Sequence, residues 1–238
     1  MFFLRNFKTL FCFLRMHLLF QYIERHLHLL ANLSAMSRWK AKYNKDLVYS
    51  DFYHMEFKRV NLRTVLFEKL KHVENLEEFT YLEFGVYKGT TMKWWLENNA
   101  NPNCSFYGFD TFEGLPEAWG HYDKGGMSVD NQFPDITDYR AKFIKGLFQN
   151  TLMGFVKSEN LNNKLIIHID ADLYSSTLYV LTVLAPYLKK GDLIIFDEFN
   201  VPNHEFRAWQ DFVNSYYIKF TPLIATENYY HFALRIEA

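Results

Sequence analysis

The chain has 238 residues, of which 49% are hydrophobic and 19% aromatic, so it can bury one large core and is not a disordered protein. Residues 1–45 carry eight Lys and Arg side chains against one acid, whereas the remainder carries 18 against 26, which excludes a general binder of nucleic acid. The two cysteines form no CxxC pair, which excludes a disulfide framework and favours a reducing, cytoplasmic compartment.

The first 33 residues are apolar but are interrupted by Arg5, Lys8, Arg15 and Arg25, so no run reaches the roughly 18 residues of a membrane span. These charges lie within the apolar part, unlike those of a secretory signal. The pattern predicts amphipathic helices with two alternative roles. They either pack on the domain or on a second subunit of a homo-oligomer, or lie peripherally on the anionic inner surface of a membrane.

Residues 34–60 are polar and mixed, which predicts a linker or a lid over the active site. We therefore divide the chain into a basic helical extension over residues 1–60 and a domain over residues 61–238. In the domain, leucines at helical spacing predict a helix within residues 61–79, and a strand follows at Thr80–Phe84.

The turn after this strand, EFGVYKGTT, has glycines at 85 and 89 that let the backbone approach a ligand closely. Thr90 or Thr91 can cap the next helix, predicted over residues 91–99. The turn lacks the GxGxxG pattern of nicotinamide and flavin enzymes. Taken by itself, it is equally typical of simple packing between a strand and a helix.

A second strand is predicted at residues 104–109, and Asp110 ends it at a spacing that suits an acid gripping ribose hydroxyls. The alternative role of Asp110 is a cap for the following turn. Residues 111–135 contain Gly and Pro turn signals and predict a long lid or binding loop. A third strand at 141–145 then ends at Gly146, and Leu147 and Phe148 lie where they could flank an adenine ring or simply join the core.

The segment 165–199 predicts a buried strand, a helix and a second buried strand, and each strand ends in acid. The acids are Asp170 and Asp172 after the first strand, and Asp197 and Glu198 after the second. Because the two strands of such a unit are parallel, both acidic clusters emerge at the same edge of the sheet. Converging carboxylates repel one another unless a cation or protons intervene, so we expect a divalent metal there. Residues 204–216 predict a further helix, and residues 220–237 an antiparallel hairpin that closes the sheet.

Five segments, in this order along the chain, resemble the macrocin O-methyltransferase family: EFGVYKGTT (83–91), GFDTFEGLPEAW (108–119), KGLFQNTL (145–152), HIDADLYSSTLYVL (168–181) and FDEF (196–199). The resemblance covers roughly residues 60–215. It implies a Rossmann-like α/β class I methyltransferase fold, with a seven-stranded, mostly parallel sheet, an antiparallel last strand and helices on both faces. It also implies a Mg²⁺-dependent enzyme that moves a methyl group from S-adenosylmethionine to a hydroxyl of a sugar, a glycosylated metabolite or a polysaccharide precursor.

Carried over residue by residue, the resemblance assigns Asp170, Asp197 and Glu198 to Mg²⁺. This chain has DAD where many relatives have DGD, and DE where many have DD at the second ligand pair. The same resemblance assigns S-adenosylmethionine to Glu83, Gly85, Val86, Tyr87, Gly89, Thr90, Asp110, Thr111, Gly146 and Phe148.

The implied mechanism requires a base for the acceptor hydroxyl. Position favours Asp170, whereas His121 in the lid loop is the alternative, because histidine exchanges protons near neutral pH. We expect a core or supporting role for His168, and a helix-capping role for Asp172. Two rival functions remain open: metal-independent methylation on the same fold, and a non-catalytic interaction module that the leader recruits to a membrane or partner.

Overall fold

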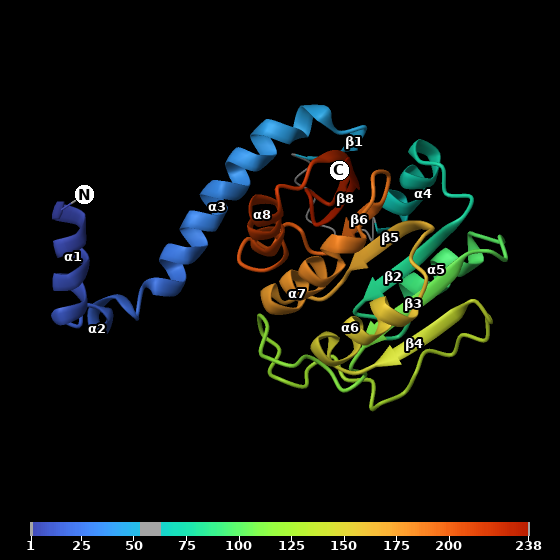
Figure 1. The fold of residues 1–238 in the computed structure, drawn as a ribbon, viewed down its shortest axis with the longest axis horizontal. Helices are drawn as coiled ribbons and strands as arrows, with labels where there is room; N and C mark the ends of the chain where they lie inside the picture. Colours follow the sequence, from blue (N-terminus) through green and yellow to red (C-terminus); the bar gives the residue numbers. More distant parts are fainter. Residues whose placement is uncertain (1, 53–62, 238) are drawn as a thin grey trace.

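The computed structural model describes residues 2–52 and 63–237 of the chain, and its centre is one eight-stranded sheet (Figure 1). The strand order is β1-β7-β8-β6-β5-β2-β3-β4, and β8 runs antiparallel to both of its neighbours while the other pairs are parallel. The strands are β1 Tyr49–Ser50, β2 Phe79–Phe84, β3 Ser105–Asp110, β4 Ala141–Lys145, β5 Lys164–Ile169, β6 Leu193–Phe196, β7 Phe220–Thr226 and β8 His231–Ile236.

The predicted sheet is therefore confirmed in its parallel order and its antiparallel last strand, and its strand count is corrected from seven to eight. The additional strand is β1, which pairs Tyr49 with Ile224 and Ser50 with Ala225 at the outer edge of β7. Two residues of mixed polarity carry no period-2 signal, so the sequence gives no indication of this strand.

Helices cover both faces of the sheet. The helices are α1 Phe2–Phe13, α2 His17–Phe20, α3 Glu24–Tyr43, α4 Arg63–Val73, α5 Thr90–Glu97, α6 Phe148–Ser158, α7 Tyr174–Leu184 and α8 Glu205–Tyr216. One core cluster joins the sheet to the second half of α3 and to α6, α7 and α8, and a second cluster joins the opposite face to α4 and α5. Buried side chains alternate between these two clusters along β5, because successive strand residues point to opposite faces.

The central β5-α7-β6 unit is confirmed, with Ile169 opposite Phe196 in parallel register. Both strands are buried along almost their whole length, which explains their continuous apolar sequence. Helix α7 is shorter than the apolar stripe of Leu178, Leu181, Ala185 and Leu188 predicts. It ends at Leu184 and gives way to a 3-10 turn at Ala185–Tyr187, since Pro186 has no N–H to continue the helical hydrogen bonds.

Residues 34–52 are not the linker or lid that their polarity suggested. The second half of α3 packs on the domain, and Trp39 is buried against Phe199, Phe206, Tyr229 and Phe232 at ring-centre distances of 5.0–6.3 Å. A 3-10 turn over Asn44–Asp46 then leads into β1. Residues 53–60 of the predicted linker lie outside the described residues, and so does the proposed domain boundary, which remains a prediction.

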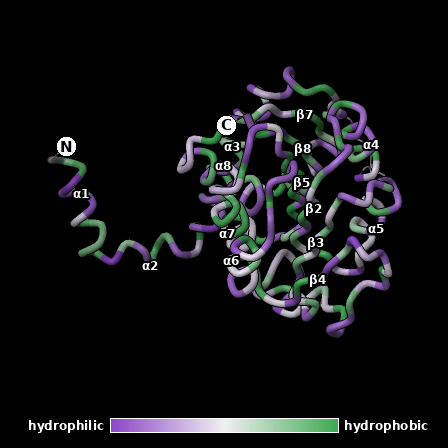
Figure 2. Tube along the Cα trace, turned by 45° about the vertical axis from the view of Figure 1, so that its right-hand side comes forward, coloured by the Kyte–Doolittle hydropathy of each residue, from purple (hydrophilic) through white to green (hydrophobic). Residues whose placement is uncertain are grey.

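The first part of the leader lies apart from this body (Figures 1 and 2). Helices α1 and α2 extend away from the domain, and almost all of their side chains are exposed. The start of α3 lies beside the body, where Glu24, Arg25 and His28 line a pocket together with Asn203 and Arg207. In the described part of the chain, no helix is both long enough and apolar enough to cross a membrane.

Candidate active site

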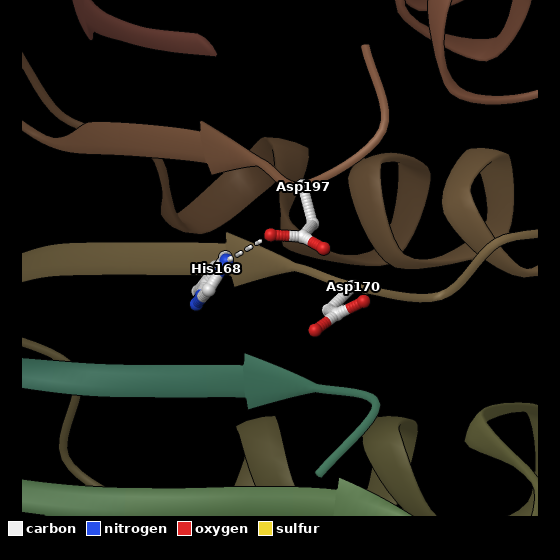
Figure 3. A group of neighbouring side chains, drawn as sticks. All are labelled: His168, Asp170 and Asp197. Atoms are coloured by element: carbon white, nitrogen blue, oxygen red, sulfur yellow. Dashed lines mark ion pairs between the residues drawn. The ribbon is translucent and has the colours of Figure 1, made fainter. Parts of the chain in front are cut away.

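Acidic side chains gather at the carboxyl edge of the sheet, as the sequence predicts (Figure 3). Asp170 directly follows β5 and Asp197 directly follows β6, and these are neighbouring parallel strands. Carboxylate oxygens of Asp170 and Asp197 and a ring nitrogen of His168 all lie within 4.8 Å of one another. Glu198 follows Asp197, and its Oε2 is buried without a hydrogen-bond partner among the described residues.

Arg63, the first residue of α4, supplies a positive charge to this cluster. Its guanidinium makes a close ion pair with Asp197 Oδ2, lies 3.3 Å from Asp170 Oδ2, and donates a hydrogen bond of 2.9 Å to Thr91 Oγ1. These converging acids predicted that a cation or protons intervene between them, and a divalent metal was expected. In this structure, the guanidinium of Arg63 lies against both acids.

The environments of the acids set their pKa values apart. Burial raises the pKa of Asp170 well above its usual range, with the negative charge of Asp197 acting in the same direction. Burial also raises the pKa of Asp172 to about 7, and raises that of Glu198. Burial alone would raise the pKa of Asp197, but the hydrogen bond from His231 and the charge of Arg63 outweigh it and lower the pKa. The cluster therefore holds one firmly ionised carboxylate beside carboxyls with higher proton affinity.

His168 has the core role that its position in β5 predicts. Its ring is fully buried, Nδ1 lies 2.8 Å from the Tyr81 hydroxyl, and Nε2 lies 4.0 Å from Asp197 Oδ1. Burial lowers the pKa of His168 to about 3, so its imidazole is neutral. A neutral ring beneath Asp197 restricts where that carboxylate can lie.

The glycine turn between β2 and α5 lies beside these acids. Gly85 has φ +95°, and a Cβ built there would lie 1.8 Å from the Asp170 carbonyl oxygen, so this contact requires glycine. Gly89, with φ +75°, packs on Pro134, where a Cβ would lie 2.6 Å from the Pro134 Cβ. Asp110 holds the turn, because its Oδ2 accepts hydrogen bonds of 2.8 Å from the backbone N–H groups of Val86 and Tyr87.

Asp110 also accepts a hydrogen bond of 2.7 Å from the Phe112 N–H through Oδ1. Asp110 therefore also caps the turn that follows β3, as the alternative prediction stated. This role does not exclude ribose binding, because a carboxylate has about four acceptor positions and Asp110 lines the cavity described below.

One cavity of about 360 Å³ joins the glycine turn to the acidic cluster. Besides Asp110, nine of the thirteen other predicted site residues line it: Gly85, Val86, Tyr87, Thr90, Thr111, Phe148, Asp170, Asp197 and Glu198. Residues of the loop between β3 and β4 close one side of it, namely Gly114, Leu115, Pro116, Tyr122 and Met127. The prediction that this loop contributes to the binding site is thus consistent with its place in the structure.

Four predicted site residues do not line the cavity. Glu83 is buried beneath the turn, where burial raises its pKa well above the usual range and leaves Oε2 without a hydrogen-bond partner in the part of the chain that is described. Gly89 and Gly146 shape the backbone behind the cavity, with φ +75° and +136°. His121 is exposed on the lid loop, with its ring 4.2 Å from that of Tyr122. Of the two bases considered, Asp170 is the one at the cavity.

Two capping predictions are wrong. Gly89 occupies the N-cap position of α5, with no side-chain cap, and the Thr91 hydroxyl accepts a hydrogen bond from Arg63 instead. Helix α7 likewise begins after Leu173 without a side-chain cap. Asp172 has φ +58°, a left-handed conformation that Asp adopts more readily than most residues. Its side chain lines the cavity with the other acids.

Arg63 is the main site residue that could not be predicted from the sequence, because it lies in an ordinary amphipathic helix pattern. Its one distinguishing signal is its place at the start of a helix that packs on the sheet. The position of Arg63 at the start of a helix does not reveal that its side chain reaches Asp197 at the carboxyl edge of the sheet. Asp197 lies 134 residues further along the chain.

Substituting Gly85 with alanine should cost far more stability than the matched substitution Gly191→Ala. Both glycines have nearly the same positive φ, but a Cβ at Gly191 meets nothing within 4 Å. We expect Gly191→Ala to cost about 1 kcal/mol of backbone strain, and Gly85→Ala at least about 2 kcal/mol more, with loss of cofactor binding. Urea unfolding and calorimetric titration with S-adenosylmethionine measure both effects. Equal costs for the two variants would contradict the close approach at Asp170.

The fold and site define a class I methyltransferase: a central sheet of this strand order, a glycine turn after the first long strand, and an acid ending the next. Solved structures of this class superpose on the chain. CalS11, described as a calicheamicin methyltransferase, has a TM-score of 0.58 at 22% identity over 72% of this chain and 76% of that one. The O-methyltransferase NovP has a TM-score of 0.53 at 17% identity over 75% and 78%.

The family follows from the sequence match. Residues 58–231 match the family described as Macrocin-O-methyltransferase (TylF), so the chain belongs to this family and is an S-adenosylmethionine-dependent O-methyltransferase. No curated protein sequence matches the chain. The matched residues do not include the leader.

Proposed function

We propose that this protein methylates a hydroxyl group of a sugar or of a glycosylated metabolite or polysaccharide precursor, with Mg²⁺ held by Asp170, Asp197 and Glu198. The main support for this proposal is that the glycine turn and the acidic cluster line the same cavity. Family membership supports it, as does the fold shared with CalS11, itself described as a TDP-rhamnose 3'-O-methyltransferase.

The donor set fits a magnesium ion. Mg²⁺ prefers oxygen ligands, and carboxylate oxygens of Asp170 and Asp197 are close enough to share one ion. The unpartnered Oε2 of Glu198 lines the same cavity, but Glu198 lies outside the group of ligand atoms within 4.8 Å of one another and would have to turn toward the two aspartates to become a third ligand. When bound, Mg²⁺ supplies a Lewis acid that lowers the pKa of an acceptor hydroxyl.

The donor side of the cavity fits S-adenosylmethionine, which supplies an electrophilic methyl group when bound. Gly85 allows the backbone to approach a ligand closely, Asp110 has acceptor capacity for hydroxyls, and Phe148 offers an aromatic ring at the cavity wall. The buried, unpartnered Oε2 of Glu83 lies just beneath the turn and can accept a hydrogen bond from a cationic group.

The chain's own residues perform two tasks in this reaction. Asp170 accepts the proton that the acceptor hydroxyl must lose, because its carboxyl group lines the cavity at the end of β5. The lid-loop residues Leu115, Tyr122 and Met127 enclose the acceptor and exclude water, which orients the reacting groups.

Two measurements test the proposal. Calorimetry should show binding of S-adenosylmethionine to the purified protein, and methyl transfer to a panel of nucleotide sugars should disappear after chelation of divalent ions and return with added Mg²⁺. The absence of cofactor binding would favour the non-catalytic module instead. Transfer that is undiminished without divalent ions would remove the magnesium part of the proposal.

A second candidate, metal-independent O-methylation, has one observation in its favour. Arg63 already provides a cation in contact with Asp170 and Asp197. If that contact persists during turnover, the guanidinium neutralises both carboxylates and leaves Asp170 to act as the base without a metal. The chelation experiment separates the two candidates directly.

A further inference from the structure

The first helix of the leader has an exposed apolar face. Phe3, Leu4, Phe7 and Leu10 recur at spacings that place them on one side of α1, and Phe3 is 84% exposed. The opposite side carries Arg5, Lys8 and Thr9, whereas Asn6 borders the apolar side. Helix α1 is thus amphipathic, but its apolar face does not contact the body of the protein.

The exposed apolar surface continues beyond α1. A ring contact of 5.5 Å between Phe11 and Phe20 holds α1 against α2, and Leu18 and Leu19 are exposed beside it. Ile23, which directly precedes α3, forms an exposed ridge at helical spacing with Leu27 and Leu30 of α3. This ridge lies on roughly the opposite side from the residues that pack on the body. We call the exposed apolar residues between Phe3 and Leu33 the leader surface.

The body offers no matching apolar face to a second copy of the leader. Among residues 34–52 and 63–237, the large apolar side chains that are exposed lie singly or in pairs on different elements: Val48, Val73, Tyr87, Met127, Phe133, Tyr139, Leu147, Met153, Tyr216 and Tyr217. Isolated exposed apolar residues are normal on a protein surface, whereas a continuous apolar surface marks a binding region.

Charge also disfavours pairing between two leaders. Residues 1–33 contain Arg5, Lys8, Arg15 and Arg25 but one acid, Glu24, so two leaders would bring like charges together. An anionic bilayer satisfies both features at once. Apolar side chains enter the boundary between headgroups and acyl chains, while Lys and Arg side chains reach the negative headgroups.

We propose that the leader surface binds the protein peripherally to an anionic lipid bilayer, with α1 and α2 lying in the plane of the interface. The second half of α3 connects this anchor to the catalytic body. Lys40 Nζ donates a hydrogen bond of 2.5 Å to Asn200 Oδ1, and Asn32 Nδ2 donates one of 2.8 Å to Asn203 Oδ1. Both acceptors lie in the loop that follows Glu198, so the anchor is attached at the edge of the sheet that carries the acids.

Cosedimentation of the full-length protein with vesicles tests the proposal. We expect binding to vesicles of phosphatidylcholine mixed with phosphatidylglycerol and little binding to phosphatidylcholine alone. Binding should fall several-fold in about 1 M salt, where the screening length is only about 3 Å. No binding, or equal binding to both kinds of vesicle, overturns the proposal.

Two charge-matched variants make the test specific to the apolar face. Leu10→Glu and Thr9→Glu add the same charge to the same helix, but on the apolar and polar sides respectively. We expect Leu10→Glu to weaken binding to the mixed vesicles about tenfold or more relative to Thr9→Glu, since it removes a large apolar side chain from the contact. Equal losses in the two variants overturn the assignment of the face.

Sedimentation velocity without lipid tests the alternative that the leader surface binds a second copy of the chain. We expect the wild type and Leu10→Glu to have the same oligomeric state, and both to retain wild-type thermal stability and S-adenosylmethionine binding, because the leader surface does not contact the body. A lipid-free oligomer that Leu10→Glu dissociates would assign the face to a second copy of the chain and overturn the lipid proposal.

Discussion

Replacing Asp197 with asparagine should lower methyl transfer by about 100-fold or more while leaving S-adenosylmethionine binding intact. Asp197 is the acid whose pKa remains low despite burial, so it is the firmly ionised member of the cluster. Asparagine keeps the shape of the side chain but removes the charge that would hold a cation opposite the acceptor. Steady-state transfer and calorimetric titration of the cofactor measure the two quantities.

The matched control is Asp211→Asn on α8, where the side chain is about half exposed and pairs with Arg207. We expect this variant to keep wild-type transfer, since exposed ion pairs contribute little. Wild-type activity in Asp197→Asn would contradict a role for this acid in the reaction. A parallel loss of cofactor binding and of thermal stability would show that Asp197 serves the fold instead.

Replacing Arg63 with glutamine should destabilise the protein by roughly 3 kcal/mol, because it leaves the buried carboxylate of Asp197 and the partly buried carboxylate of Asp170 without their opposite charge. For a chain of this size, that loss corresponds to a fall in melting temperature of about 6–12 °C. Added Mg²⁺ should raise the melting temperature of Arg63→Gln more than that of the wild type, since the guanidinium no longer occupies the acids. Thermal unfolding with and without Mg²⁺ provides the comparison.

The same variant separates the two candidate functions. With magnesium-dependent transfer, Arg63→Gln should retain activity in saturating Mg²⁺, whereas metal-independent transfer that relies on the guanidinium should be lost at every Mg²⁺ concentration. Arg207→Gln is the control, because Arg207 makes a partly exposed pair within one helix and should contribute less than about 1 kcal/mol. A melting temperature of Arg63→Gln equal to that of the wild type would contradict the ion pairs described here.

The residues of the β5-α7-β6 unit show why much of the site is readable from sequence. Continuous apolar runs identify β5 and β6, and the chain direction of such a unit makes them parallel. That alone places Asp170 and Asp197 at the same edge, and the register of Ile169 with Phe196 confirms it. The importance of the glycines at 85 and 89 can be predicted from the sequence for a similar reason, since each meets a local requirement for positive φ and close packing.

The orientation of a side chain could not be predicted from the sequence where it depends on contacts with distant segments. His121 and Asp172 illustrate this in opposite directions: the loop between β3 and β4 turns His121 outward, whereas the left-handed backbone at Asp172 turns this acid toward the cavity. Neither orientation has a local sequence signal, because each depends on how a loop folds against other elements.

Short-range periodicity and linked motifs are sufficient to predict the fold class, the family, the two strands that end in acids and the amphipathic nature of the leader. The residues that surround the site are visible only in the folded chain. Folding brought Arg63 across 134 positions to Asp197, packed Trp39 of α3 into the core, and left the apolar face of α1 exposed. Contacts between distant segments depend on the whole arrangement of helices on the sheet, which no local pattern specifies.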